Sequence, residues 1–104
     1  GNYEKAAGLF ADNVSRNPEN SGLIFYWAIS QMGAAQTDQA IENLKYLIQI
    51  EDHPFPKQVT WYLALAYLEN GQKEKSSDLL EKIKEEPNHP YHDKAKRLLK
   101  KLGT

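Results

Sequence analysis

The sequence contains no cysteine, carries a formal net charge of only −1 and has no glycine-rich phosphate-binding loop. Without cysteine, the chain can form neither a disulfide framework nor a thiolate metal site or nucleophile. The balanced charge gives no overall attraction to nucleic acid or to an acidic membrane. No apolar run approaches the roughly 20 residues that a membrane-spanning helix requires. These absences exclude several large functional classes before any motif is considered.

The amino-acid composition is that of an ordinary globular protein. Its 104 residues are 40% hydrophobic, 26% charged and 11% aromatic. This composition predicts an ordered protein, and the length accommodates one hydrophobic core. We therefore expect a single domain.

The most informative pattern is an internal repeat. The segment 24–48 can be laid over 60–84 without a gap, so the two copies are 36 residues apart. A period of 20 to 50 residues is typical of stacked repeat proteins. The overlay pairs Tyr26 with Tyr62, Ala28 with Ala64, Gln36 with Gln72 and Leu44 with Leu80, and it matches Phe25/Trp61, Ile29/Leu65, Met32/Leu68, Asp38/Glu74 and Leu47/Ile83 conservatively.

Helical spacing of apolar residues predicts an all-α chain of six helices and no strand. The expected helices cover residues 3–16, 23–34, a third from Thr37 onward, and then 57–70, 74–86 and 90–102. Thr37 is expected to be an N-cap, Gly71 a left-handed helix end, and Pro90 a first helical residue. The third helix should bury one stripe of side chains: Ala40, Ile41, Leu44, Leu47 and Ile48.

Small residues recur where paired helices would have to approach closely. In the second copy, these positions and the aromatic and glycine positions near them are occupied by Ala64, Tyr67, Gly71, Ser76 and Leu80. In the first copy, the corresponding residues are Ala28, Gln31, Ala35, Ala40 and Leu44. In these residues the chain resembles the tetratricopeptide repeats. The resemblance implies a right-handed superhelix of stacked antiparallel helix hairpins.

The resemblance divides the single domain into a half-repeat (1–18), two repeats (22–52 and 57–87) and a C-terminal capping helix (90–102). Because Gly1 occupies the turn position of an earlier unit, we expect the chain to be a fragment of a longer protein. The family's tryptophan position holds Ile24 and Thr60, Gln31 replaces an aromatic residue, and the linker at His53 is two residues longer than usual.

In such repeats the concave surface, lined by the first helix of each pair, generally binds partners. The resemblance places Phe25, Ile29, Met32 and Gly33, and then Trp61, Leu65, Leu68 and Glu69, on that surface. It implies a non-catalytic scaffold that binds a peptide or partner protein in the groove. Three alternatives stay open: the stripe is core covered by the last helix, the chain is a homo-oligomerisation segment, or it is a regulatory domain of a larger envelope protein.

The histidines offer the only starting point for catalysis or metal binding. His89, His92 and Asp93 form a compact cluster, but it lacks a fourth ligand and straddles a helix start. We interpret these residues as part of a solvated turn, with His89 at a cap position. His53, between Glu51 and Asp52, is expected on a surface loop. We expect no catalytic residue, no metal and no cofactor.

The last helix is basic on one face, where it carries Lys94, Lys96, Arg97, Lys100 and Lys101. Cations near a helix C-terminus complement its dipole, and no aromatic platform for bases accompanies them. We therefore expect a polar capping helix rather than a nucleic-acid contact. The segment 65–75 followed by this terminus is similar to bacterial envelope proteins, which implies an extracytoplasmic, periplasmic location.

Overall fold

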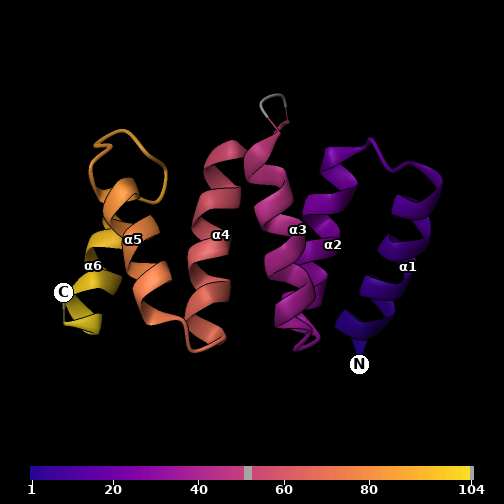
Figure 1. Cartoon of the computed structure of the whole chain (residues 1–104), viewed down its shortest axis with the longest axis horizontal. Coiled ribbons are helices and arrows are strands. Elements are labelled where there is room, and N and C mark those ends of the chain that lie inside the picture. The colour runs from indigo at the N-terminus through magenta and orange to yellow at the C-terminus, as the bar shows by residue number, and fades with distance from the viewer. Residues whose placement is uncertain (51–52, 104) are drawn as a thin grey trace.

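The computed structural model describes residues 1–50 and 53–103, which form six α-helices and no strand. Figure 1 shows the helices side by side in a row, from α1 at one end to α6 at the other. The predicted all-α architecture is confirmed. The helices are α1 (Asn2–Arg16), α2 (Ser21–Gly33), α3 (Thr37–Gln49), α4 (Pro56–Glu69), α5 (Lys73–Lys84) and α6 (His92–Leu102).

Each helix packs against the next one along the chain, and α2 also contacts α4. Contacts confined to successive helices and to adjacent repeats are the pattern of a stacked repeat array. The molecule is accordingly elongated, with extents of 41 × 29 × 18 Å. Within the described ranges, no helix is long and apolar enough to cross a membrane.

The small residues of the repeat lie where the helices meet. Ala28 and Ala64 in the first helix of each hairpin, and Ala40 and Ser76 in the second, are all 0% exposed. A larger side chain at these positions would overfill a close-packed interface. The prediction that compact residues allow these helices to approach is therefore confirmed.

Helices α2 and α4 end in the same hydrogen-bonded turn. The N–H groups of Gln36 and Gln72 donate to the carbonyls of Gln31 and Tyr67, each at 2.8 Å. This six-to-one bond defines a Schellman motif, which requires a left-handed residue just before the donor. Gly71 supplies it in α4 (φ +76°), as predicted, and Ala35 supplies it in α2 (φ 61°).

The tight turns explain two errors in the predicted helix starts. Thr37 is not an N-cap but the first helical residue, because Gln36, which closes the turn after α2, also caps α3. Pro90 is not helical, because α6 begins only at His92. The N–H of His92 donates to the carbonyl of His89 at 3.0 Å, so Pro90 lies in a turn that precedes the helix.

Helix α3 buries four of the five residues predicted for its stripe, namely Ala40, Ile41, Leu44 and Leu47. Ile48 is instead 44% exposed. Successive helical residues are rotated by about 100°, so the residue after buried Leu47 faces away from the neighbouring helices. The prediction for Ile48 was wrong for this reason.

The core consists of two connected clusters. The first joins α2, α3 and α4, and the second joins α4, α5 and α6. Tyr62 and Leu79 pack against both clusters. Helix α4 is therefore shared between two packing layers, and its two sides are covered by different neighbours.

Candidate binding surface

The residues predicted to line a groove fall into three groups by exposure. Phe25 and Trp61 are buried, at 6% and 9% exposed, so they belong to the core. Glu69 at the end of α4 is exposed. The half-buried residues are Ile29 and Met32 of α2 and Leu65 and Leu68 of α4. The predicted stripe is thus core at one end and accessible along the rest of its length.

Gly33, the last residue of α2, lies beneath an aromatic ring. A Cβ atom at Gly33 would be 2.4 Å from the ring of Tyr3 in α1. That distance is shorter than van der Waals contact, so any other residue at this position would have to displace the exposed Tyr3 ring. The Tyr3 ring at the start of α1 therefore contacts this end of the predicted stripe, although Gly33 itself stays exposed.

Aromatic rings from the linkers cover Phe25 and Trp61. The Phe55 ring stacks on Phe25 with centroids 4.7 Å apart, and the Tyr91 ring stacks on Trp61 at 5.0 Å. Phe55 and Tyr91 are themselves 36 residues apart, and each follows a His-Pro pair. The linkers therefore repeat with the same period as the helices. The overlay of 24–48 on 60–84 did not reveal this because it ends before both linkers.

The histidines before these aromatic residues organise the linkers. The Nδ1 atom of His53 accepts the N–H of Phe55 at 3.3 Å, and Nδ1 of His89 accepts the N–H of Tyr91 at 3.0 Å. His53 is half-buried and His89 is 6% exposed. The prediction that His89 is a solvated cap residue was wrong, because its ring closes a turn against the core.

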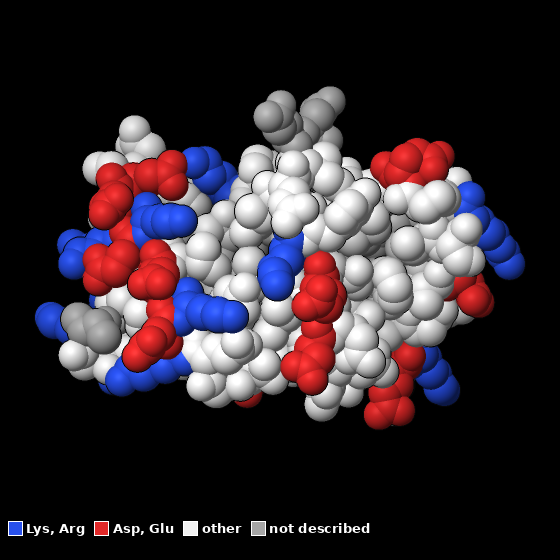
Figure 2. All heavy atoms as spheres, viewed as in Figure 1, with Lys and Arg blue, Asp and Glu red and all other residues white. Residues whose placement is uncertain are grey.

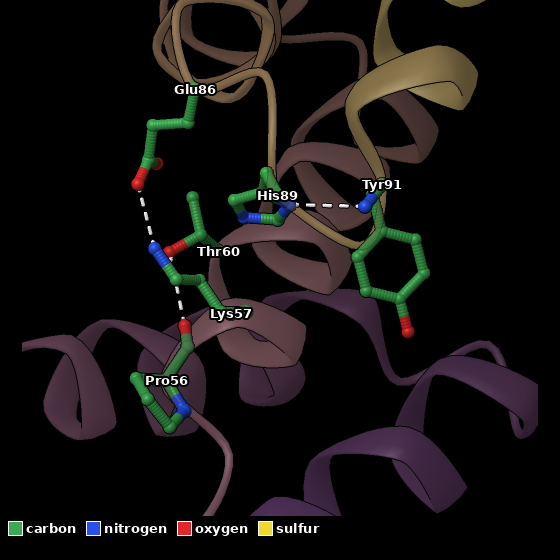
Figure 3. Close-up of polar contacts among 6 residues, drawn as sticks. All are labelled: Pro56, Lys57, Thr60, Glu86, His89 and Tyr91. Carbon is green, nitrogen blue, oxygen red and sulfur yellow. Dashed lines mark hydrogen bonds and ion pairs between the residues drawn. The ribbon is translucent and has the colours of Figure 1, made fainter.

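Figure 3 shows His89 close to an ion pair between α4 and the loop after α5. Lys57 Nζ lies 2.6 Å from Glu86 Oε1. The hydrogen bond from Lys57 lowers the pKa of Glu86, whereas burial lowers the pKa of His89 and raises that of Tyr91. Both partners of the ion pair are about half exposed, so its contribution to stability is small.

The remaining residues of the histidine cluster lie at the start of α6. His92 is the first residue of the helix and Asp93 lies in its first turn. In the part of the chain that the structure describes, no group of three or more His, Cys, Asp or Glu side chains is placed to hold a metal ion. Glu51 and Asp52, which precede His53 in the sequence, lie outside the described residues.

Gln31, the departure from the family's aromatic position, has a specific partner. It is 3% exposed, and its Oε1 accepts a hydrogen bond from Asn43 Nδ2 of α3 at 2.8 Å. In the next repeat the equivalent residues are Tyr67 and Leu79, which belong to the same apolar cluster. A buried amide requires such a hydrogen bond. One repeat therefore uses a polar pair where the other uses an apolar pair.

Comparison with known proteins gives one match. Residues 58–89, which cover most of α4, all of α5 and the turn to His89, match the family model of the tetratricopeptide repeat. Neither curated proteins nor solved structures give a match. Repeats of this family generally mediate protein–protein interaction or assembly and are generally non-catalytic. Residues 58–89 therefore form a hairpin that matches one tetratricopeptide repeat, and the preceding hairpin repeats its pattern 36 residues earlier.

Proposed function

We propose that this chain is a non-catalytic module that binds a peptide or a segment of a partner protein along the face formed by α2 and α4. The observation that carries this proposal is the partial exposure of Ile29 and Met32 on α2 and of Leu65 and Leu68 on α4. The two helices contact each other. Their accessible apolar side chains therefore provide one surface from two adjacent elements.

The chemistry of this surface is suited to apolar side chains of a partner. Helix α2 has no charged residue, and α4 has charges only at Lys57 and Glu69, near its two ends. Met32 has an unbranched side chain that adapts to differently shaped partners. An amphipathic helix or an extended peptide with spaced apolar residues can dock on such a surface.

Selection from a displayed random-peptide library, followed by affinity measurement with the purified chain, tests this function. Met32→Lys and Leu68→Lys each place a charge within the proposed surface and should weaken the selected peptides about tenfold or more. Tyr46→Lys is the matched control, because Tyr46 is 49% exposed on α3. If no peptide is enriched, or if all three variants bind equally, the proposed surface is wrong.

A second candidate function is assembly with a copy of the same chain. Tyr3 and Leu9 of α1 are 58% and 66% exposed, which leaves apolar side chains at one end of the row of helices. Light scattering over a range of protein concentrations tests this function directly. A dimer that becomes monomeric in Leu9→Lys would support it, and a monomer at every concentration would exclude it.

A further inference from the structure

Helix α6 is the counterpart of α4 in the repeat, although its sequence looks different. Its buried residues Ala95 and Leu99 lie 36 positions after Val59 and Leu63, two of the buried residues of α4. Both helices also follow a His-Pro-aromatic linker. Helix α6 therefore stands where a further first helix would stand, and its outward positions can be compared with those of α4.

The comparison shows a change of chemistry at three positions of the repeat. The α4 residues and their counterparts 36 positions later are Gln58 and Lys94, Trp61 and Arg97, and Leu65 and Lys101. The three cations are exposed. Polar Gln58, buried Trp61 and half-buried Leu65 of α4 thus correspond to exposed cations on α6.

The cations and the apolar residues meet in an open cleft of about 450 Å³ between α4 and α6. Trp61, Leu65 and Leu98 provide its apolar lining, whereas Lys94, Arg97 and Lys101 provide its charge. No acidic residue lines this cleft. Among the described residues, no carboxylate forms an ion pair with any of the three cations.

The opposite arrangement is seen on α5. In Figure 2 acidic and basic side chains lie interspersed over the end of the molecule that includes α5, where each charge has neighbours of opposite sign. Interspersed charges are typical of a solvated helix face. Unbalanced cations beside accessible leucines instead favour a ligand that brings negative charge and an apolar group together.

We propose that the cleft between α4 and α6 binds an acidic segment of the partner protein. In this arrangement one apolar side chain of the segment packs on Leu65 and Leu98, and flanking carboxylates pair with Lys94, Arg97 and Lys101. The proposal rests on the proposed interaction function and adds the chemistry of the partner.

A protein segment suits the cleft better than nucleic acid does. Trp61 is nearly buried and its ring is stacked on Tyr91, so it offers no platform on which a base could stack. The two leucines likewise match an aliphatic side chain rather than a base or a phosphate. Arg97 can bind a carboxylate through two parallel hydrogen bonds.

The test uses fluorescence polarisation with a labelled peptide in which glutamates flank two central leucines. A peptide with lysines in place of the glutamates is its control. We expect the acidic peptide to bind and the basic one not to bind. Replacing Lys94 and Lys101 together by glutamate should weaken binding about tenfold or more, and added salt should weaken the wild-type complex.

The matched protein control is the pair Lys5→Glu and Arg16→Glu on α1. Each pair changes the net charge equally, and each removes one cation near a helix start and one from a last turn. A carboxylate at Lys94 lies in the first turn of α6, where it complements the helix dipole. The second carboxylate of each pair lies in a last turn and opposes the dipole, so the two double variants are matched in this respect too, and circular dichroism should show that both remain folded.

Three results would overturn the inference. Equal weakening in the two double variants would mean that only overall charge matters. Tighter binding of a single-stranded oligonucleotide or of phosphatidylserine vesicles, lost in the Lys94 and Lys101 variant, would assign the cations to those ligands. Failure of the acidic peptide to bind, while library peptides bind at Met32 and Leu68, would reject the acidic partner and leave the proposed function intact.

Discussion

The Trp61 and Tyr91 rings stack with their planes 4° apart and their centroids separated by 5.0 Å. Phe25 and Phe55 form the equivalent contact 36 residues earlier, at 4.7 Å and 29°. In both repeats the linker returns an aromatic ring onto the first helix of the preceding hairpin. The linkers therefore contribute to the core, and they determine how much of the predicted groove is accessible.

A double-mutant cycle on Trp61 and Tyr91 should reveal this contact. Trp61→Leu and Tyr91→Leu each remove one ring, and stacked aromatic pairs contribute about 0.5–1.5 kcal/mol beyond the area that they bury. We expect a coupling free energy of that size from urea denaturation of the two single variants and the double variant. The effects of Trp61→Leu and of Tyr46→Leu, a change at an exposed position of α3, should instead be additive. Additivity in both pairs would show that the stack contributes nothing specific.

The buried histidine of the second linker predicts a pH dependence of stability. Burial lowers the pKa of His89 below its ordinary value of 6.5. Between this lowered pKa and pH 6.5 the unfolded chain therefore binds a proton that the folded chain does not bind. The stabilising contribution is complete above pH 6.5 and decreases as the pH falls toward the lowered pKa. Denaturation midpoints measured between about pH 7.5 and pH 5 should fall accordingly.

His89→Asn separates this effect from other titrations. An asparagine carbonyl can accept the N–H two residues later, so it can replace the Nδ1 bond to Tyr91 without titrating. The variant should lose stability less steeply between pH 7.5 and about pH 5 than the wild type does. The pKa of Glu86 is lowered from 4.5, so its contribution is lost only at lower pH. Parallel pH profiles for variant and wild type would contradict the role of His89.

The sequence predicted the helices and their packing well because both depend on local, periodic signals. Ala28 and Ala64 occupy equivalent positions, and glycine at 71 indicates a left-handed residue directly. The linkers were less predictable because their structure depends on contacts with distant residues. The burial of His89 accompanies a turn in which its ring accepts the N–H of Tyr91, and the burial of Phe25 involves a ring from the next linker.

The groove illustrates the same limit. Sequence spacing placed Trp61 and Leu65 on one face of a helix, but spacing does not show which residues are covered by another element. Tyr91 covers Trp61, whereas Leu65 stays half-buried. The basic counterparts of this face on α6 were visible in the sequence as a charged helix face. These residues can be aligned with the groove residues of α4 only when the linkers are seen to repeat with the same 36-residue period as the helices.

Exchanging the left-handed residues of the two repeats should change stability in opposite directions. Ala35 is held at φ 61°, a conformation that costs a residue with a Cβ about 1 kcal/mol or more relative to glycine. Ala35→Gly should therefore stabilise the chain by about 1 kcal/mol, and Gly71→Ala should destabilise it similarly. Thermal or urea denaturation measures both.

A glycine inside a helix provides the control for these exchanges. Gly8 lies within α1, and a Cβ atom there would contact nothing within 4 Å. Gly8→Ala should stabilise the protein by about 1 kcal/mol, because alanine favours a helix interior. The same substitution should thus have opposite signs at Gly8 and Gly71. Equal signs would show that the turn after α4 does not require a left-handed residue.

The polar pair between α2 and α3 should be replaceable only as a unit. Asn43→Leu removes the donor to Gln31 and leaves a buried amide without its partner, which should cost about 1–3 kcal/mol. Gln31→Tyr alone should also destabilise, since it removes the acceptor of Asn43. The double variant reproduces the Tyr67 and Leu79 pair of the next repeat, so it should recover most of the loss. Urea denaturation of the wild type, the two single variants and the double variant measures the coupling free energy. If the loss of stability in the double variant equals the sum of the losses in the single variants, the two repeats do not share one packing arrangement.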